Sequence, residues 1–157
     1  MVKRSNYALK LQVKTLFIEK WQTDFMVSNS TVHRIDDLES LVYEDKKEIK
    51  GLLTFTVRNQ EMEIVSLDSF EENRGIGTAL LDEAIRFYQQ NAFKRLWLIT
   101  TNDNLNALRF YQKRNFSITA VHLHAVEAAR TLKPSIPKWG NDGIAIEHEI
   151  ELTYCSL

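Results

Sequence analysis

The stretch that decides the fold runs Glu72-Asn73-Arg74-Gly75-Ile76-Gly77-Thr78-Ala79-Leu80-Leu81. It joins an alternating segment that ends near Leu67 to a segment whose apolar residues recur at helical spacing, so it predicts a strand–turn–helix unit. Closely spaced glycines let backbone amides approach an anion, and a helix N-terminus adds partial positive charge. Arg74 can add a charge-assisted contact to the same anion. The alternative is that Gly75 and Gly77 only permit a tight turn and close helix packing.

Two familiar phosphate-binding motifs do not fit this turn. A P-loop requires Gly-x-x-x-x-Gly-Lys-Ser/Thr, and the chain contains no such run. A dinucleotide fingerprint requires Gly or Ala three residues beyond the second glycine, where this chain has Leu80. The turn therefore supports neither an ATPase nor a dehydrogenase.

Working outward from the turn, strands and helices alternate along the chain. Residues Glu61–Leu67 alternate as a strand should, and Gly75–Asn91 carries one apolar helical face. The remaining expected helices are Tyr7–Trp21, Leu105–Arg114 (capped by Asn102 or Asp103) and Ala125–Leu132. The remaining expected strands are Phe25–Val27, Ser40–Glu44, Ile49–Val57 (interrupted at Gly51 by a bulge or a weak point), Arg95–Thr100, Phe116–Leu123 and Ala145–Tyr154. The class is therefore α/β (α+β): a mixed, mostly antiparallel sheet with a strand-helix-strand-helix-strand second half. Part of that half, including Phe116–Leu123, is expected to pair in parallel.

Composition limits the function classes. The chain has 157 residues, 44% of them apolar, and a formal charge of −1, which fits one domain over residues 1–157. Near-zero charge argues against a nucleic-acid partner, and no apolar run approaches the ~20 residues of a membrane span. The single cysteine, Cys155, excludes an internal disulfide and a cysteine-based zinc site. No apolar segment follows the basic start, so we expect a cytoplasmic protein.

A second motif lies downstream, at Asn104-Leu105-Asn106-Ala107-Leu108-Arg109-Phe110-Tyr111-Gln112-Lys113-Arg114-Asn115-Phe116. In this order, and separated by a helix and a strand, the two motifs resemble the GNAT superfamily of acyl-CoA-dependent N-acyltransferases. The first resembles the pyrophosphate loop Gln/Arg-x-x-Gly-x-Gly/Ala, and the second the segment Asn-x-x-Ala-x-x-Phe-Tyr. The chain departs from the pattern in having Glu72 at the first loop position, Asn73 where glycine is common and Ser69 where proline often follows the strand.

The resemblance implies a binding site for acetyl-CoA, used as a co-substrate without a metal. Because Glu72 is a poor phosphate ligand, the pyrophosphate falls to Arg74 and the amides of Arg74, Gly75, Ile76, Gly77 and Thr78. The pantetheine arm would bond to the backbone around Val65 and Leu67 in a sheet that opens after this strand. Asn104 would bond the same arm, with a helix N-cap as its alternative role.

The resemblance also implies direct transfer from the thioester to an amine in a ternary complex. Tyr111 stands at the position of the family's general acid, and its alternative role is a core aromatic. Glu61 and Glu63 share one strand face, and either could be the base, while the alternative for at least one is a solvated face. His122 and His124 lack acidic residues at zinc-ligand spacing, so no metal is expected.

The long loop Lys133–Gly143 precedes the last expected strand, and loops of this length are often functional. Trp139 is our candidate acceptor-binding residue, and a lid over the sheet edge is its alternative. The sequence thus predicts an N-acetyltransferase of a small-molecule or protein amine, with cationic acceptors favoured by Glu61, Glu63 and Asp68. A non-catalytic acyl-CoA sensor and a homodimer stay open.

Overall fold

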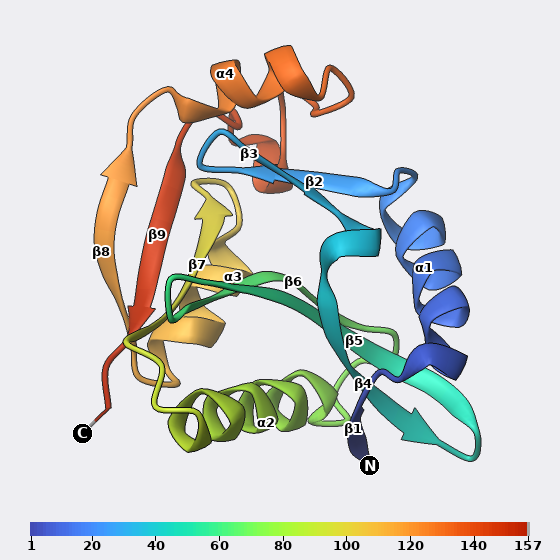
Figure 1. Cartoon of the computed structure of the whole chain (residues 1–157). Helices are drawn as coiled ribbons and strands as arrows, with labels where there is room; N and C mark the ends of the chain where they lie inside the picture. The colour runs from blue at the N-terminus through green and yellow to red at the C-terminus, as the bar shows by residue number, and fades with distance from the viewer. Residues whose placement is uncertain (157) are drawn as a thin grey trace. The chain divides into compact units, whose positions relative to one another are not determined.

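The structure, a computed structural model, describes residues 1–156. It is a mixed α/β fold with mostly antiparallel strands and four α-helices in the described chain (Figure 1). The chain forms two compact units. The first comprises Met1–Met26 and His33–Leu96, and the second comprises Val27–Val32 and the residues from Trp97 onward.

In the first unit, four strands pair antiparallel in the order β1-β4-β5-β6. Its elements are β1 (Val2–Arg4), α1 (Tyr7–Trp21), the 3-10 turn η1 (Ile35–Asp37), β4 (Glu39–Asp45), β5 (Glu48–Arg58), β6 (Glu61–Ser69) and α2 (Ile76–Gln90). The hairpin of β2 (Phe25–Ser28) and β3 (Thr31–Arg34) has its base in this unit and its tip in the second.

In the second unit, β9 runs antiparallel between β7 and β8. The elements are β7 (Arg95–Thr101, whose first two residues belong to the first unit), α3 (Leu105–Gln112), β8 (Phe116–His122), α4 (Ala125–Leu132), the 3-10 turn η2 (Asn141–Gly143) and β9 (Glu149–Tyr154). Because the C-terminal strand returns between the other two, β8 pairs antiparallel. The expectation of parallel pairing for this strand was therefore wrong.

The first unit buries its apolar residues on both faces of its sheet. On one face, Val42 and Leu52 lie opposite each other and cluster with Val13 and Phe17 of α1. On the other face, α2 covers the strands (Figure 1), and the ring of Phe55 lies 5.5 Å from that of Phe87. This alternation is what a strand buried on both faces should show.

Most of the expected elements are confirmed, and the helices Tyr7–Trp21 and Ala125–Leu132 have the expected bounds. The register between β4 and β5 shifts beside Gly51, which confirms the bulge there. The short strands β1 and β3 were not predicted. The last strand begins at Glu149 rather than Ala145, because the Asn102 side chain accepts the amide hydrogens of residues 147 and 148.

Candidate active site

The turn before α2 is open and has no capping side chain in the described chain. Gly75 is the N-cap and has φ +68°, a conformation that L side chains rarely adopt. A Cβ placed on it would meet no described heavy atom within 4 Å, and the first turn of α2 contains no acidic residue. The first amides of a helix have no partner within the helix. This end of α2 therefore has the donors and the space that an anion needs.

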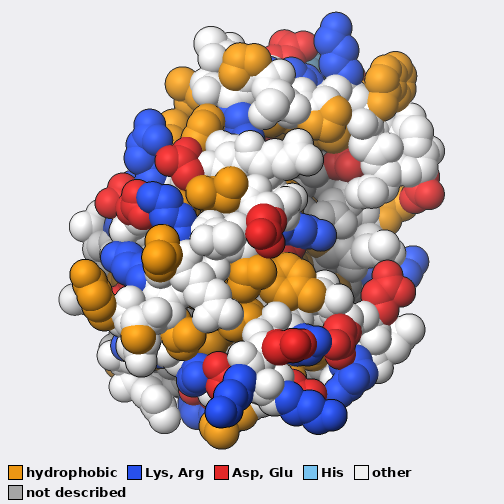
Figure 2. Space-filling model, turned by 90° about the vertical axis from the view of Figure 1, so that its right-hand side faces the viewer, with side chains coloured by type: hydrophobic (Ala, Val, Ile, Leu, Met, Phe, Trp, Pro, Cys, Tyr) orange, Lys and Arg blue, Asp and Glu red, His pale blue; other side chains and the backbone are white. Residues whose placement is uncertain are grey.

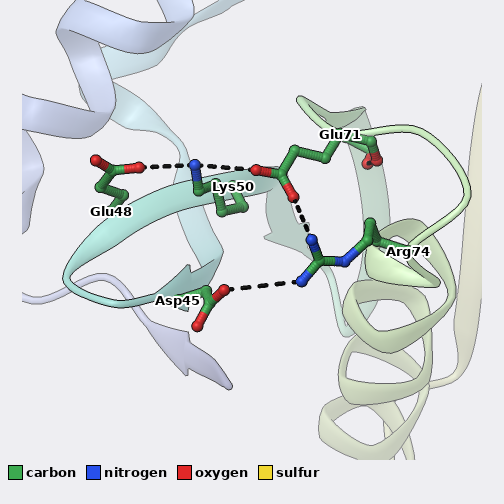
Figure 3. A network of polar contacts seen from close by, with 6 residues as sticks. Asp45, Glu48, Lys50, Glu71 and Arg74 are labelled. Atoms are coloured by element: carbon green, nitrogen blue, oxygen red, sulfur yellow. Dashed lines mark hydrogen bonds and ion pairs between the residues drawn. The ribbon is translucent and has the colours of Figure 1, made fainter.

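Arg74 lies beside this turn in a network of charges (Figure 3). Its guanidinium donates to Glu71 Oε2 at 3.1 Å and lies 3.8 Å from Asp45 Oδ2. Lys50 Nζ bridges Glu48 at 2.7 Å and Glu71 at 3.0 Å. The hydrogen bonds that Lys50 donates to Glu48 and Glu71 raise the pKa of Lys50, and the bond to Glu71 lowers the pKa of that carboxyl group. A phosphate that binds Arg74 would thus compete with two carboxylates.

Strand β6 carries a row of three polar side chains on the face that α1 covers. Glu63, Ser66 and Asp68 lie opposite residues 56, 54 and 52 of β5, which share one face, and Leu52 belongs to the α1 cluster. Along β6 the interval is two residues between Ser66 and Asp68 but three between Glu63 and Ser66. The reason is that Val65 is the extra residue of a bulge: Ser66 opposes Thr54 and Ile64 opposes Phe55. All three polar residues are buried.

Each side chain of this row has a polar neighbour. Ser66 and Thr54 share a hydrogen bond of 2.6 Å, and Trp21 donates its indole N–H to Asp68 Oδ2 at 3.1 Å. Burial raises the pKa of Asp68, and the bond from Trp21 partly offsets that rise. The Glu63 carboxylate lies 3.6 Å from His33 Nε2 of β3.

The two candidate bases therefore occupy different environments. Glu63 is buried, whereas Glu61 is partly exposed at the end of the β5–β6 hairpin, opposite Arg58. A buried carboxylate has less competing water than an exposed one, which favours Glu63 as a base that contacts a substrate.

The second unit contains Asn104, which precedes α3, and Tyr111, which lies on α3. Asn104 is the N-cap, and its Oδ1 accepts the Ala107 amide hydrogen at 3.1 Å, so the cap lies here and not at Asn102 or Asp103 as expected. Tyr111 is buried, with its ring 5.1 Å from that of Phe110 and 5.3 Å from that of Phe116. Both residues thus have the structural roles that were their alternatives, and their roles toward acetyl-CoA stay predictions.

Trp139 lies in a loop that polar side chains hold in place. Trp139 is 68% exposed, and its backbone forms an isolated bridge with Ala145. Asn102 donates to the Ala145 carbonyl at 2.9 Å, in addition to accepting from two amides. Buried Asp103 accepts the backbone and side-chain N–H groups of Asn141 at 3.1 and 3.3 Å. The loop thus presents a large exposed aromatic side chain from an ordered backbone.

Sequence reasoning missed His33 and the anchoring roles of Asn102 and Asp103. Thr31–Arg34 is too short to show a reliable period, and the contact of His33 with Glu63 spans thirty positions in sequence. The Asn-Asp pair after a strand was instead interpreted as a helix cap.

Charges of both signs are interspersed on the face shown in Figure 2, in keeping with the near-zero net charge. Within residues 1–156, no group of three or more His, Cys, Asp or Glu residues is arranged to hold a metal ion. None of the described helices is both long and apolar enough to cross a membrane.

Comparisons with known proteins place this geometry in a family. Residues 7–116 match the model of the acetyltransferase (GNAT) family. The uncharacterized protein YdhI of Bacillus subtilis (strain 168) is 42% identical over 147 residues, which cover 93% of this chain and 92% of YdhI. A Bacillus subtilis acetyltransferase solved in complex with CoA superposes with a TM-score of 0.71 at 17% identity, covering 99% of this chain and 98% of that one. A GNAT family acetyltransferase from Elizabethkingia anophelis with acetyl-CoA bound superposes with a TM-score of 0.69 at 22% identity. The match covers 98% of this chain and 96% of that one. Because the family model spans most of its length, the chain belongs to the GNAT family of acetyltransferases.

Proposed function

We propose that this chain is one catalytic domain that transfers an acetyl group from acetyl-CoA directly to a primary amine in a ternary complex. Acetyl transfer is the activity of the family to which it belongs. The observation that carries the finer proposal is that a bulged strand with a buried carboxylate, Glu63 of β6, is followed in the chain by the N-terminus of α2, where the N-cap Gly75 supplies no side-chain hydrogen bond. The strand offers a base, and the helix offers a phosphate site.

The donor acetyl-CoA would bind through its pyrophosphate at the start of α2. Gly75, Ile76, Gly77 and Thr78 would offer backbone amides, and the open space at Gly75 leaves room for a phosphate. Arg74 would add its charge after exchanging a carboxylate for the phosphate. A solved relative of the same fold has acetyl-CoA bound, which supports this choice of donor.

The pantetheine arm would bond to the β6 backbone at Val65 and Leu67. An extended amide-bearing arm and a strand satisfy each other's main-chain groups. At a bulge the extra residue leaves the regular ladder, and Val65 is that residue. Its amide could then hold the oxyanion that forms when the amine attacks the thioester.

The reaction requires two proton transfers. The amine loses a proton to a general base, a role that we assign to Glu63, with Glu61 as the second candidate. The departing thiolate gains a proton from a general acid, a role that we assign to Tyr111. The acetyl carbonyl carbon first forms a bond to nitrogen, which gives the oxyanion, and its bond to sulfur breaks when the carbonyl re-forms. Asn104 would bond the cofactor arm through its side-chain amide, and Trp139 would contact the acceptor.

The test is release of free CoA thiol from acetyl-CoA in the presence of single amines: spermidine, kanamycin, lysine and a short peptide with a free amino terminus. Thiol release that depends on one of these amines supports the proposal. Glu63→Gln and Tyr111→Phe should lower kcat by about 10²-fold or more with the acetyl-CoA KM little changed. Glu61→Gln is the comparison variant: a smaller loss of kcat than in Glu63→Gln would support Glu63 as the base, and a larger loss would assign the base to Glu61.

A melting scan with acetyl-CoA separates the other readings. A ligand at about 100 times its Kd adds about 2.7 kcal/mol to the stability of the native state. Stabilisation by acetyl-CoA without thiol release for any amine would favour an acyl-CoA sensor over an enzyme. No stabilisation at all would contradict both functions.

A further inference from the structure

Strand β3 buries a polar side chain and exposes an apolar one. In the run Thr31-Val32-His33-Arg34, Val32 is 37% exposed and His33 is 3% exposed. A shift of one residue would exchange the two faces and bury the valine. Burying a polar ring in place of an apolar side chain costs free energy unless the ring meets a partner. The alternation of β3 is thus set by something other than burial of apolar area.

The partner is Glu63. The Nε2 atom of His33 lies 3.6 Å from Glu63 Oε1, and the two side chains are 1% and 10% exposed. The distance is longer than a hydrogen bond, and contacts at catalytic groups are often long before substrate binds and shorten in the complex. The other two polar residues of the row have partners that are not ionisable: Ser66 shares a hydrogen bond with the hydroxyl of Thr54, and Asp68 accepts one from the indole of Trp21. The group beside Glu63, by contrast, is itself ionisable.

We propose that His33 is a positioning residue that holds the Glu63 carboxylate in the orientation in which it takes the proton of the acceptor amine. The inference rests on the proposed function. A glutamate carboxylate lies beyond three rotatable bonds and has many orientations, and proton transfer requires the few that point an oxygen at the amine. By contacting Oε1, His33 limits rotation of the carboxylate in a site where water is scarce.

The experiment compares His33→Leu, His33→Gln, Glu63→Gln and the double variant His33→Leu/Glu63→Gln, with the most active amine of the panel above. His33→Leu removes the ring nitrogen that contacts Glu63 but fills the space, and it should lower kcat about tenfold or more with the acetyl-CoA KM unchanged. His33→Gln can place an N–H near the position of Nε2 and should recover activity to within about threefold of the wild type. The double variant should be no slower than Glu63→Gln alone, because His33 acts only through Glu63.

A purely structural histidine predicts a different pattern. Wild-type kcat in His33→Leu, equal losses in His33→Leu and His33→Gln, or losses that multiply in the double variant would each overturn the inference. Wild-type kcat in Glu63→Gln would overturn it by removing Glu63 from the reaction, while leaving the acetyltransferase proposal intact. Thiol release with no amine at all would instead overturn the proposed function together with this inference.

A second readout does not depend on turnover. In protein labelled with ¹⁵N-histidine, the ring nitrogens of His33 should shift when Glu63→Gln is introduced and should not shift with Glu61→Gln. Unchanged His33 resonances in Glu63→Gln would contradict the contact on which the inference depends.

Discussion

A single added methyl group at Gly51 tests how the start of α2 is held. Gly51 faces α2 from β5, and a Cβ placed on it would overlap the Cγ2 methyl of Ile76. It would also come within 3.0 Å of Leu80 Cδ1 and 3.2 Å of the Asp68 carbonyl oxygen. Ile76 is β-branched, so its methyl cannot swing away freely, and it is the first residue of α2. The helix start must therefore move, or the methyl must stay strained.

The expected cost follows from two opposing effects. Overpacking a buried site costs about 1–3 kcal/mol. Replacing glycine by alanine at an ordinary φ recovers about 0.4–1 kcal/mol through the lost entropy of the unfolded chain. Gly51→Ala should therefore lower the free energy of unfolding by about 1–2 kcal/mol. For a chain of this length that corresponds to a fall in Tm of about 2–8 °C.

Thermal unfolding of Gly51→Ala, Ile76→Ala and the double variant, each with and without acetyl-CoA, provides the assay. Ile76→Ala alone removes buried methyl groups and costs about 2–5 kcal/mol. Because it also removes the methyl that the new Cβ overlaps, the double variant should lose less than the sum of the two. Gly51→Ala should also reduce stabilisation by acetyl-CoA, since it displaces the proposed phosphate site. An unchanged or higher Tm for Gly51→Ala, or strict additivity in the double variant, would refute the reasoning.

Three further predictions concern single side chains. Gly75→Ala should cost about 1–2 kcal/mol from backbone strain alone, since its Cβ meets no described atom, and Gly75→Asn should cost less in the same melting scan because Asn tolerates positive φ. Asn104→Asp keeps the helix cap but loses the side-chain amide donor, so its Tm should stay near the wild-type value while the acetyl-CoA KM rises. A KM equal to that of the wild type would mean that Asn104 caps the helix and does not bind the cofactor arm. Burial raises the pKa of Asp68, so the native state holds that proton more tightly than the unfolded chain, and the stability this group adds is lost as pH rises through the native pKa. Asp68→Asn, which still accepts from Trp21, should therefore raise Tm more at about pH 7 than at about pH 4, each unit of raised pKa being worth about 1.4 kcal/mol; a pH-independent difference in Tm would contradict this.

The sequence predicted the parts of the fold that depend on local patterns. Period-two alternation located Glu61–Ser69 to within two residues, and helical spacing with glycines at 75 and 77 located the start of α2 to one. The family resemblance pointed to this same strand and helix, and the family match includes both.

Features that depend on distant contacts could not be predicted. The strand β1 has three residues, and it forms because β4 is there to pair with it. The last strand starts late because the side chain of Asn102, more than forty positions earlier, takes two of its expected amides. Likewise, Glu61 and Glu63 look equivalent in sequence, and only packing distinguishes the buried one from the one at the hairpin end.

The loop that presents Trp139 is ordered by Asn102 and Asp103, which lie outside it. The Asn102 and Asp103 side chains of the β7–α3 turn bond residues 141, 145, 147 and 148, and the Arg130 side chain of α4 bonds the carbonyls of residues 136, 137 and 146. Because these few side chains hold the whole segment, the loop should open as a cooperative unit with its own, lower unfolding free energy. Such a segment can accumulate substitutions, insertions and new side chains while the sheet stays folded. If Trp139 contacts the acceptor as proposed, new acceptor preferences could evolve in the loop without a cost to the stability of the rest of the chain.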